Sequence, residues 1–521
     1  MGDKKNQNNK EHKKDKNRDK NRDNNKNQDK PDTNRLIQER MRKLKEIREL
    51  GINPYPYSYE VTHHAKQIHE EFEKLKPEEK TKSKVSVAGR IMLMRPMGKA
   101  AFMHIQDQSG KIQLYLRQDD IGKDKIKFLK KLDVGDYIGV KGTIFKTKTG
   151  EVTIYVDDYE LLCKTLRPLP EKFHGLKDTE LRYRKRYLDL IMNPDVKQVF
   201  IKRAKVIQKI RDYFNERSYL EVETPILQPI YGGANARPFK SHLNALNMDV
   251  FLRVSNELYL KRLLVGGFER VYEFAKDFRN EDIDRTHNPE FSMVEYYQAY
   301  ADYNEIMDLT EDLIVSVAEE VFGKLKFQYE DKTINFKKPW KRMTMRKALI
   351  KHAQIDVDKL TDDELKDLLR SYAINYEGDY TKGLATQLLF EELVEDKLIQ
   401  PTFITDHPIE TTPLCKPLRK GDQMIVERFE LFIAGMEFAN AYSELNDPIL
   451  QRKLLEDQAK QLRAGSEEAH PMDEDFIECI EYGMPPTGGC GIGVDRLIIL
   501  LTENLSIRDV LLFPFMKPIE E

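Results

Sequence analysis

One stretch of the chain, 277–297 (DFRNEDIDRTHNPEFSMVEYY), combines residue types that together can bind a polar ligand. It holds a permanent cation, two carboxylates, an imidazole and an aromatic ring, namely Arg279, Glu281, Glu295, His287 and Phe291. Apolar and aromatic runs flank the polar centre, so the pattern predicts two strands joined by a long loop, 281–289. A solvated loop with ordinary surface charges is the alternative, and residues further along the chain decide against it.

A second group of carboxylates lies in 427–447 (ERFELFIAGMEFANAYSELND), at Glu430, Glu437 and Glu444. Their spacing of seven fits one face of a helix, but the aromatic and β-branched residues on both sides of Gly435 favour two strands or one bent strand. Carboxylate oxygens are the hard ligands that divalent cations such as Mg²⁺ prefer. A single glutamate taken alone is more often a surface charge.

Glycine-rich segments mark two further places where the backbone can approach a ligand. The first is YGGANARPF, at 231–239. The second is GGCGIGVDRLIILLT, at 488–502, which predicts a glycine-rich turn leading into a long apolar helix with Arg496 at its start. A helix N-terminus reinforced by an arginine is an anion site.

Length and composition limit the class of protein. The chain has 521 residues, which favours more than one domain. It carries 86 Lys+Arg against 88 Asp+Glu, so its net charge of -2 excludes a polycation and leaves nucleic-acid binding to local patches. No apolar run is long enough to span a bilayer. The cysteines form no CxxC pair, which fits a reducing, cytoplasmic location without membrane partners.

The N-terminal part predicts a tail, a helix and a barrel. Residues 1–34 are rich in Lys, Asn and Asp and are expected to be disordered, either as a solubilising tail or as a weak phosphate-binding one. Within 35–166, an amphipathic helix over 35–50 precedes five short strands with a helical stretch between the third and fourth. That order is typical of an oligonucleotide-binding barrel. Arg90, Phe102 and Gln113 are placed to stack on and read unpaired bases, although a barrel without a ligand is the alternative.

The remainder predicts a connector and a second domain. Residues 167–190 read as the connector, and the basic cluster within them (Arg182, Arg184, Lys185 and Arg186) fits a solvated helix face or an RNA contact. The second domain, 191–521, opens with a long helix that starts at Pro194. An extended segment follows, ending at Pro225. Helices are expected over 301–330 and, as an insertion, over 341–400, where a capping box begins at Thr361.

Three motifs in order carry a resemblance: EVETP at 221–225, FRNE at 278–281 and GIGVDR at 491–496. They resemble motifs 1, 2 and 3 of the class II aminoacyl-tRNA synthetases. Longer segments (GGANARPF, NELYLKRLLVGGFERVYE, RTHNPEFSMVEYYQAYADY, EFANAYSELNDP and GMPPTGGCGIGVDRL) are similar to the lysyl-tRNA synthetases, the subgroup with an N-terminal anticodon-binding barrel. The resemblance covers 36–518.

The resemblance implies an α+β fold, with an OB-type five-stranded barrel before an antiparallel class II catalytic sheet flanked by helices. It implies an enzyme that activates L-lysine with ATP to lysyl-adenylate and transfers the lysyl group to the 3′ end of tRNA(Lys). It also implies Mg²⁺ as cofactor and a homodimer, since the first motif packs across a two-fold axis in that class. These are expectations from the resemblance alone.

The resemblance also implies a role for each matching residue. The implied ATP contacts are Arg279, Glu281, His287, Asn288, Phe291, Glu430 and Arg496, with Arg279 and Arg496 as the catalytic cations. The implied lysine contacts are Gly233, Glu257, Arg279, Glu295, Tyr297, Asn440, Tyr442 and Glu444. The implied Mg²⁺ ligands are Glu430 and Glu437, and the implied anticodon contacts are Arg90, Phe102 and Gln113.

Charge supports lysine over the related substrates. A buried ammonium must be paired, and the stretches assigned to the pocket offer the acids Glu257, Glu295 and Glu444. An aspartate- or asparagine-specific relative, the nearest alternative, would need cations there. A non-catalytic nucleic-acid-binding protein of the same fold would be expected to have lost residues such as Arg279 or Arg496, which this chain retains.

Overall fold

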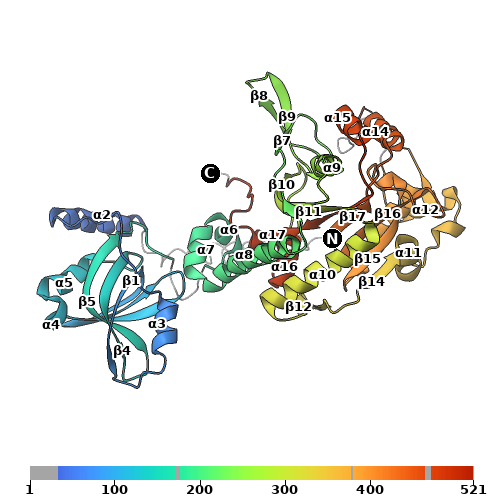
Figure 1. The fold of residues 1–521 in the computed structure, drawn as a ribbon. Coiled ribbons are helices and arrows are strands. Elements are labelled where there is room, and N and C mark those ends of the chain that lie inside the picture. The colour runs from blue at the N-terminus through green and yellow to red at the C-terminus, as the bar shows by residue number, and fades with distance from the viewer. Residues whose placement is uncertain (1–32, 171–175, 377–378, 464–470, 520–521) are drawn as a thin grey trace, which may run out of the picture. The chain divides into compact units, whose positions relative to one another are not determined.

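The computed structural model describes residues 33–170, 176–376, 379–463 and 471–519, and the chain divides into two compact units, Met1–His174 and Gly175–Glu521 (Figure 1). The division falls inside the predicted connector. Nearly all of the predicted disordered tail lies outside the described residues, and Thr33 and Asn34 already belong to the first helix. Within the described ranges, no helix is both long and apolar enough to cross a membrane.

The first unit is a closed five-stranded barrel, as predicted, with strand order β1-β2-β3-β5-β4. Its strands are β1 (Lys80–Met97), β2 (Ala100–Gln106), β3 (Lys111–Arg117), β4 (Tyr137–Lys146) and β5 (Val152–Cys163). Its helices are α2 (Thr33–Glu49), α3 (Ala65–Phe72), α4 (Gln118–Ile121) and α5 (Lys123–Phe128). Alternate residues of β2 and β3 fill the interior, which leaves Phe102 and Gln113 on the outer face.

The second unit is built on an eight-stranded sheet whose six central strands are antiparallel. In spatial order the strands are β14 (Lys341–Thr344), β15 (Thr402–Pro408), β16 (Ile425–Ile433), β17 (Met436–Ser443), β18 (Thr487–Gly493), β11 (Glu290–Ala299), β10 (Arg270–Phe278) and β6 (Leu220–Glu221). Smaller sheets are formed by β12 (Lys326–Tyr329) with β13 (Lys332–Asn335), and by β7 (Leu227–Gln228), β9 (Met248–Leu252) and β8 (Lys240–Leu243).

Two long helices, α8 (Pro194–Asn215) and α10 (Tyr303–Phe322), pack side by side on one face of the sheet (Figure 1). Phe214 of α8 packs on Tyr272 and Tyr296, with ring centroids 4.9 and 4.8 Å away. The Tyr296 hydroxyl lies 2.6 Å from that of Thr310 on α10. Because strand side chains alternate, the neighbours of these core residues face the opposite side of the sheet, where the candidate site lies.

The other helices are α6 (Thr179–Arg184), α7 (Arg186–Met192), α9 (Glu257–Val265), α11 (Met345–Ala353), α12 (Asp362–Ser371), α13 (Lys382–Leu393), α14 (Pro448–Arg463), α15 (Glu474–Glu481), α16 (Val494–Leu501) and α17 (Ile507–Val510). The capping box at Thr361 and Glu364 is confirmed at the start of α12. Helices α11 to α13 share their own apolar cluster, which includes Leu349, Leu365 and Phe390. The helix expected over 301–330 is shorter than predicted, because Gly323 ends α10 in a left-handed conformation and β12 follows.

One residue of the basic cluster in the predicted connector, Arg186, fits neither a solvated helix face nor an RNA contact. Arg186 is completely buried: its guanidinium bonds Asp189 at 2.7 Å and the carbonyls of Arg508 and Leu512 at 2.6 and 3.1 Å. It therefore fastens α7 to the C-terminal segment of the second unit. A solvated face or an RNA contact is excluded for Arg186, since a buried cation needs these partners.

Three elements of the second unit meet at one buried carboxylate. Asp495, on α16, accepts a hydrogen bond from the backbone N–H of Ser292 on β11 at 2.7 Å and pairs with Arg203 of α8 at 2.5 Å. Arg203 also donates to the Ser292 hydroxyl at 3.0 Å. This junction joins α8, β11 and α16.

Candidate functional site

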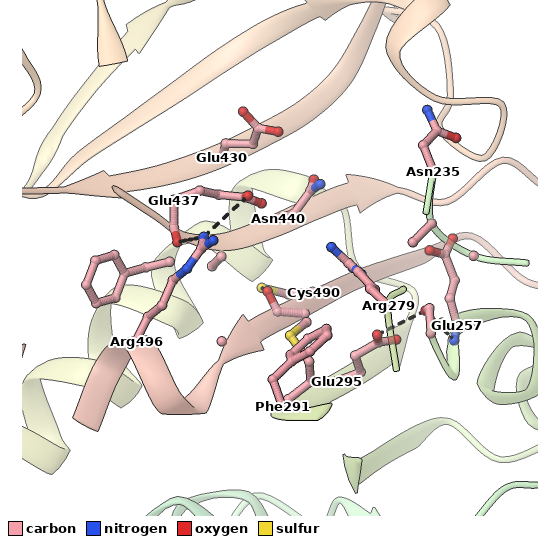
Figure 2. A pocket seen from close by; sticks show the side chains of 18 of the residues that line it. Asn235, Glu257, Arg279, Phe291, Glu295, Glu430, Glu437, Asn440, Cys490 and Arg496 are labelled. Carbon is pink, nitrogen blue, oxygen red and sulfur yellow. Dashed lines mark hydrogen bonds and ion pairs between the residues drawn. The ribbon is translucent and has the colours of Figure 1, made fainter. Parts of the chain in front are cut away.

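A cavity of about 360 Å³ opens on the face of the sheet opposite α8 and α10 (Figure 2). Every residue for which the sequence predicted ATP, lysine or metal contact lines it: Gly233, Glu257, Arg279, Glu281, His287, Asn288, Phe291, Glu295, Tyr297, Glu430, Glu437, Asn440, Tyr442, Glu444 and Arg496. These residues come from β11, β16, β17, α9 and α16 and from loops, including the loop between β10 and β11. Only the folded chain brings these residues together around one cavity, because no single motif contains them all.

The predicted hairpin of 277–297 is confirmed as β10 and β11, paired from Arg270 with Gln298 to Phe278 with Glu290. The loop between them is organised by Asp284, whose carboxylate accepts hydrogen bonds from the backbone N–H of His287 at 2.7 Å and lies 2.8 Å from its Nδ1. Partial burial raises the pKa of Asp284, but these hydrogen bonds prevail and lower it to about 2. The loop therefore presents His287 to the cavity in one orientation.

Arginine groups and a histidine line one end of the cavity. Arg496 donates to the Glu437 carbonyl oxygen at 2.6 Å, and its other terminal nitrogen lies 3.0 Å from Nε2 of His287. The Arg279 guanidinium lies over the Phe291 ring, 5.1 Å from its centroid. Among the described residues, Arg279 Nε is buried without a hydrogen-bond partner, so its fork is available to an anion.

Buried carboxylates line the other end of the cavity. Glu295 accepts hydrogen bonds from Ser255 Oγ at 3.1 Å and from the Tyr297 hydroxyl at 3.3 Å. Burial, with the nearby carboxylates of Asp277 and Glu257, raises the pKa of Glu295 well above its usual range. Figure 2 shows Arg279 extending between this acidic end and the end that holds Glu437 and Arg496. The site can therefore hold two ligands, one anionic and one cationic, that meet at Arg279.

A buried lysine lies behind two of these carboxylates. Lys261 Nζ is 2.6 Å from Glu257 Oε1 and 2.5 Å from Glu444 Oε2. Burial opposes the ammonium form of Lys261, but the two carboxylates prevail and raise its pKa. Burial also raises the pKa of Glu444, to about 8, although Lys261 opposes that rise. Lys261 was not among the predicted site residues.

The glycine run at 488–493 differs from the prediction. It is a strand, β18, in the middle of the sheet instead of a turn, and the helix that follows, α16, has only 8 residues. A Cβ on Gly489 would lie 2.3 Å from Glu444 Oε1 and 2.3 Å from the Tyr297 ring. Glycine is needed because the pocket side chains lie directly on the strand backbone, not because a turn requires it.

Glu430 and Glu437 occupy the two strands of the predicted hairpin, β16 and β17, which turn at Ala434 and Gly435 with positive φ. Glu430 is paired with Arg428, which also donates to Asn440 Oδ1 at 3.1 Å. Across the described residues, no cluster offers three or more metal-ligating side chains. Two carboxylates that line one cavity would suit Mg²⁺, which keeps several waters and is bound by one or two carboxylates together with substrate phosphates.

Comparisons with known proteins decide the family. A model of "tRNA synthetases class II (D, K and N)" matches residues 178–517, and one of an "OB-fold nucleic acid binding domain" matches 85–162. The lysine–tRNA ligase of Clostridium novyi is 52% identical over 490 residues, which is 93% of this chain and 95% of that protein. The lysine–tRNA ligase of Carboxydothermus hydrogenoformans is 52% identical over 493 residues, 94% of this chain and 99% of that protein. This chain belongs to the lysine–tRNA ligase family.

In this lysine–tRNA ligase family member, the barrel brings only two of the three predicted anticodon residues near one another. Phe102 and Gln113 lie on the outer face of the neighbouring strands β2 and β3, and Phe102 packs on Tyr115 with ring centroids 4.7 Å apart. Arg90 lies further along β1, opposite Gln106, and donates to the Gly135 carbonyl at 2.9 Å and the Tyr137 hydroxyl at 3.0 Å.

Sequence reasoning missed an arginine on that barrel face. Arg95 is exposed and lies directly opposite Phe102 in the β1–β2 ladder, so both side chains project from the same face. Gln113 is held beside them by hydrogen bonds with Glu151 at 2.6 Å and Thr153 at 2.9 Å. The strand alternation of β1 and β2 was the signal that would have found Arg95, once their register was known.

Sequence reasoning also missed Ser255 and Arg428, which line the cavity, and Lys261, which lies behind its wall. Lys261 follows Glu257 by four residues in α9, a spacing that places both on one side of the helix. That signal was readable in the sequence. Ser255 and Arg428 carried no such signal, because their partners Glu295 and Asn440 are distant in the chain.

Proposed function

We propose that this protein is a lysine–tRNA ligase, which activates L-lysine with ATP to lysyl-adenylate and transfers the lysyl group to the 3′ end of tRNA(Lys), releasing pyrophosphate and AMP. One observation supports this most directly: a single cavity has a cationic end and an acidic end, with Arg279 between them. ATP matches the cationic end and lysine the acidic end.

The acidic end supports lysine as the amino acid. Glu295 and Glu444, with Tyr297, would hold the ε-ammonium, while Glu257, near the Gly233 backbone, would hold the α-ammonium. All four of these side chains are at most 5% exposed. Buried carboxylates of this kind reject aspartate and asparagine side chains, which would leave them unpaired or repelled. Asn440 and Tyr442 would complete the wall of the pocket.

At the cationic end, the activation step requires two anions to meet. An oxygen of the lysine carboxylate attacks the α-phosphorus of ATP, and pyrophosphate leaves from the opposite side. Arg279 would contact both the carboxylate and the α-phosphate, so it lowers their repulsion in the transition state. Phe291 and Arg496 would hold the two faces of adenine, with Glu281 at its amino group and His287 and Asn288 on the nucleotide.

Glu430 and Glu437 would hold Mg²⁺, which supplies charge neutralisation on the phosphates when it is bound. Arg428 pairs with Glu430 and bonds Asn440, and would thereby keep the carboxylate of Glu430 facing the phosphates. This part of the site is proposed from the donor types and their positions on β16 and β17.

The test of the proposed function is ATP–pyrophosphate exchange measured with each amino acid in turn, followed by charging of tRNA(Lys). Lysine should support exchange and the other amino acids should not. Exchange with aspartate or asparagine but not lysine would refute the proposal. Exchange with lysine but no charging of tRNA(Lys) would restrict it to the activation step.

Lysine capture should depend on pH in a definite direction. The ionised form of Glu444 binds an ammonium, and burial raises the pKa of Glu444 to about 8. The substrate ε-ammonium stays charged to about pH 10. Raising the pH from about 7 to about 8 should therefore lower the KM for lysine roughly fivefold, with little change in the KM for ATP. A flat KM for lysine across this range in initial-rate exchange assays would contradict the assignment of Glu444.

The outer face of the barrel is proposed to bind the anticodon through Phe102 and Gln113. Phe102→Ala should raise the KM for tRNA(Lys) in aminoacylation by roughly ten- to a hundredfold, because base–aromatic stacking contributes about 1–3 kcal/mol. Lysine-dependent exchange, which needs no tRNA, should stay unchanged. Phe128→Ala, a truncation at the barrel core, is the matched control for loss of stability.

Two variants test which arginine on the outer face of the barrel contacts the anticodon, Arg95 or Arg90. Arg95→Ala should weaken tRNA binding more than Arg90→Ala, because Arg95 lies opposite Phe102 and Arg90 is occupied by Gly135 and Tyr137. The reverse order would support Arg90 as the anticodon residue.

We also propose a homodimer. Apolar side chains around the first motif are exposed in the single chain, including Ile201 (43%), Leu220 (46%), Ile226 (44%) and Leu227 (53%). A patch of this kind is typical of an interface. Sedimentation equilibrium of the full chain tests it, and an active monomer would contradict it. A cytoplasmic location stays a prediction from cysteine usage.

A further inference from the structure

Lys261 has no role in the proposed reaction, yet its surroundings are unusual. It lies on α9, its side chain is 0% exposed, and Glu257 lies one turn before it. The cavity is lined by Glu257 and Glu444 but not by Lys261. The ammonium is therefore enclosed behind the pocket wall, where a substrate does not reach it.

The ion pairs of Lys261 use one oxygen of each carboxylate. Its Nζ lies 2.6 Å from Glu257 Oε1 and 2.5 Å from Glu444 Oε2. Both oxygens of Glu444 are buried without a hydrogen bond among the described residues, but Oε2 is ion-paired with Lys261, whereas Oε1 lies beside Gly489 at the pocket. Lys261 thus contacts Oε2 of the Glu444 carboxylate and leaves Oε1, at the pocket, for a ligand. An unpaired buried carboxylate oxygen needs a cationic partner.

The charges of the pocket residues also fit a ligand with two ammonium groups. Glu257, Glu295 and Glu444 contribute three negative charges when ionised, and Lys261 contributes one positive charge. Their sum is minus two, which the two positive ammonium groups of a diamino acid would neutralise. The carboxylate of that amino acid is left for Arg279. A buried site in which the charges cancel avoids the large cost of an unpaired ion.

We propose that Lys261 is a positioning residue that sets the net charge of the lysine pocket and ties the carboxylate for the α-ammonium to the carboxylate for the ε-ammonium. This inference rests on the proposed function. Lys261 acts through Glu257 and Glu444 and does not touch the substrate. Because both carboxylates are attached to one ammonium, their separation is set by the protein before lysine enters, which selects a ligand with cations at both ends.

The test removes the charge and keeps the shape. In Lys261→Met, Glu257 and Glu444 are left close together without a counter-ion, so one of them takes up a proton at neutral pH. The KM for lysine in ATP–pyrophosphate exchange should rise at least about thirtyfold, while the KM for ATP changes less than about threefold. The pH at which kcat/KM for lysine reaches half its maximum should move upward by more than about one unit.

The pH readout separates positioning from structural damage. Several titratable or charged groups face the pair of carboxylates Glu257 and Glu444. They are Glu295 and Tyr297 on β11, Arg428 on β16, Tyr442 on β17, and Cys415 and Lys416 in the segment before β16. All are retained in the variant, so a shifted profile reports the lost ammonium. Leu264→Ala is the matched control, since Leu264 is buried in the apolar core on the same helix. It should lower the melting temperature without moving the pH profile.

Two further variants keep the inference testable if Lys261→Met does not fold. Lys261→Gln keeps a hydrogen-bond donor without the charge and should show the same alkaline shift, whereas Lys261→Arg should restore the wild-type profile. Folded Met or Gln variants that keep the wild-type KM for lysine and the wild-type pH profile would overturn the inference. Failure of the unmodified protein to exchange with lysine would instead refute the proposed function, so the two failures are distinguishable.

Discussion

Arg279→Ala should lower kcat/KM for lysine-dependent ATP–pyrophosphate exchange by about a thousandfold, the scale observed when a single preorganised donor to transition-state charge is removed. The guanidinium lies over Phe291, and its Nε is buried without a hydrogen-bond partner among the described residues. It is available to both the lysine carboxylate and the α-phosphate. The loss should fall mainly on kcat, because the repulsion between these anions is greatest in the transition state.

Two companion variants sharpen this result. Arg279→Lys keeps the charge but loses the planar fork, and we expect it to recover only a small part of the activity. Arg270→Ala removes an exposed arginine at the other end of β10, where it bonds the Arg217 carbonyl, and should leave exchange unchanged. Near wild-type kcat in Arg279→Ala, measured under saturating lysine and ATP, would remove Arg279 from the mechanism.

Glu444→Gln should reduce kcat/KM for lysine by two to three orders of magnitude, or about 3–4 kcal/mol. The variant loses the carboxylate proposed to bind the ε-ammonium and also leaves Lys261 with only Glu257 as its ion-pair partner among the described residues. Both effects disfavour a second ammonium in the pocket. The proposed ATP contacts lie at the other end of the cavity, so the affinity for a non-hydrolysable ATP analogue should stay within about threefold.

The control for Glu444→Gln is a buried carboxylate outside the pocket. Glu427 is 3% exposed, pairs with Arg419 at 2.6 Å and accepts a hydrogen bond from Ser443 at 2.6 Å. Glu427→Gln should lower the melting temperature while the KM for lysine stays the same. Lysine-dependent exchange at wild-type efficiency in Glu444→Gln would show that the ε-ammonium binds elsewhere.

Local patterns predicted most of the elements correctly. The β10–β11 hairpin, the barrel strands, the β16–β17 hairpin and the capping box of α12 depend on neighbours within a few residues, so alternation and cap residues reveal them. The run of glycines in β18 was misread as a turn for the opposite reason. Glycine favours turns locally, whereas here Tyr297 and Glu444 of neighbouring strands occupy the space above its backbone.

The types and order of the cavity-lining residues were contained in the amino-acid sequence, because joining a carboxylate to a phosphate would demand cations such as Arg279, and binding lysine would demand acids such as Glu444. The sequence did not reveal how those residues pair with one another and with their neighbours. Lys261 behind Glu444, Arg186 enclosed by its carbonyls and Arg95 opposite Phe102 all depend on segments far apart in the chain. Burial and register arise only when the sheet and barrel assemble, and these decide which charges are available to a ligand.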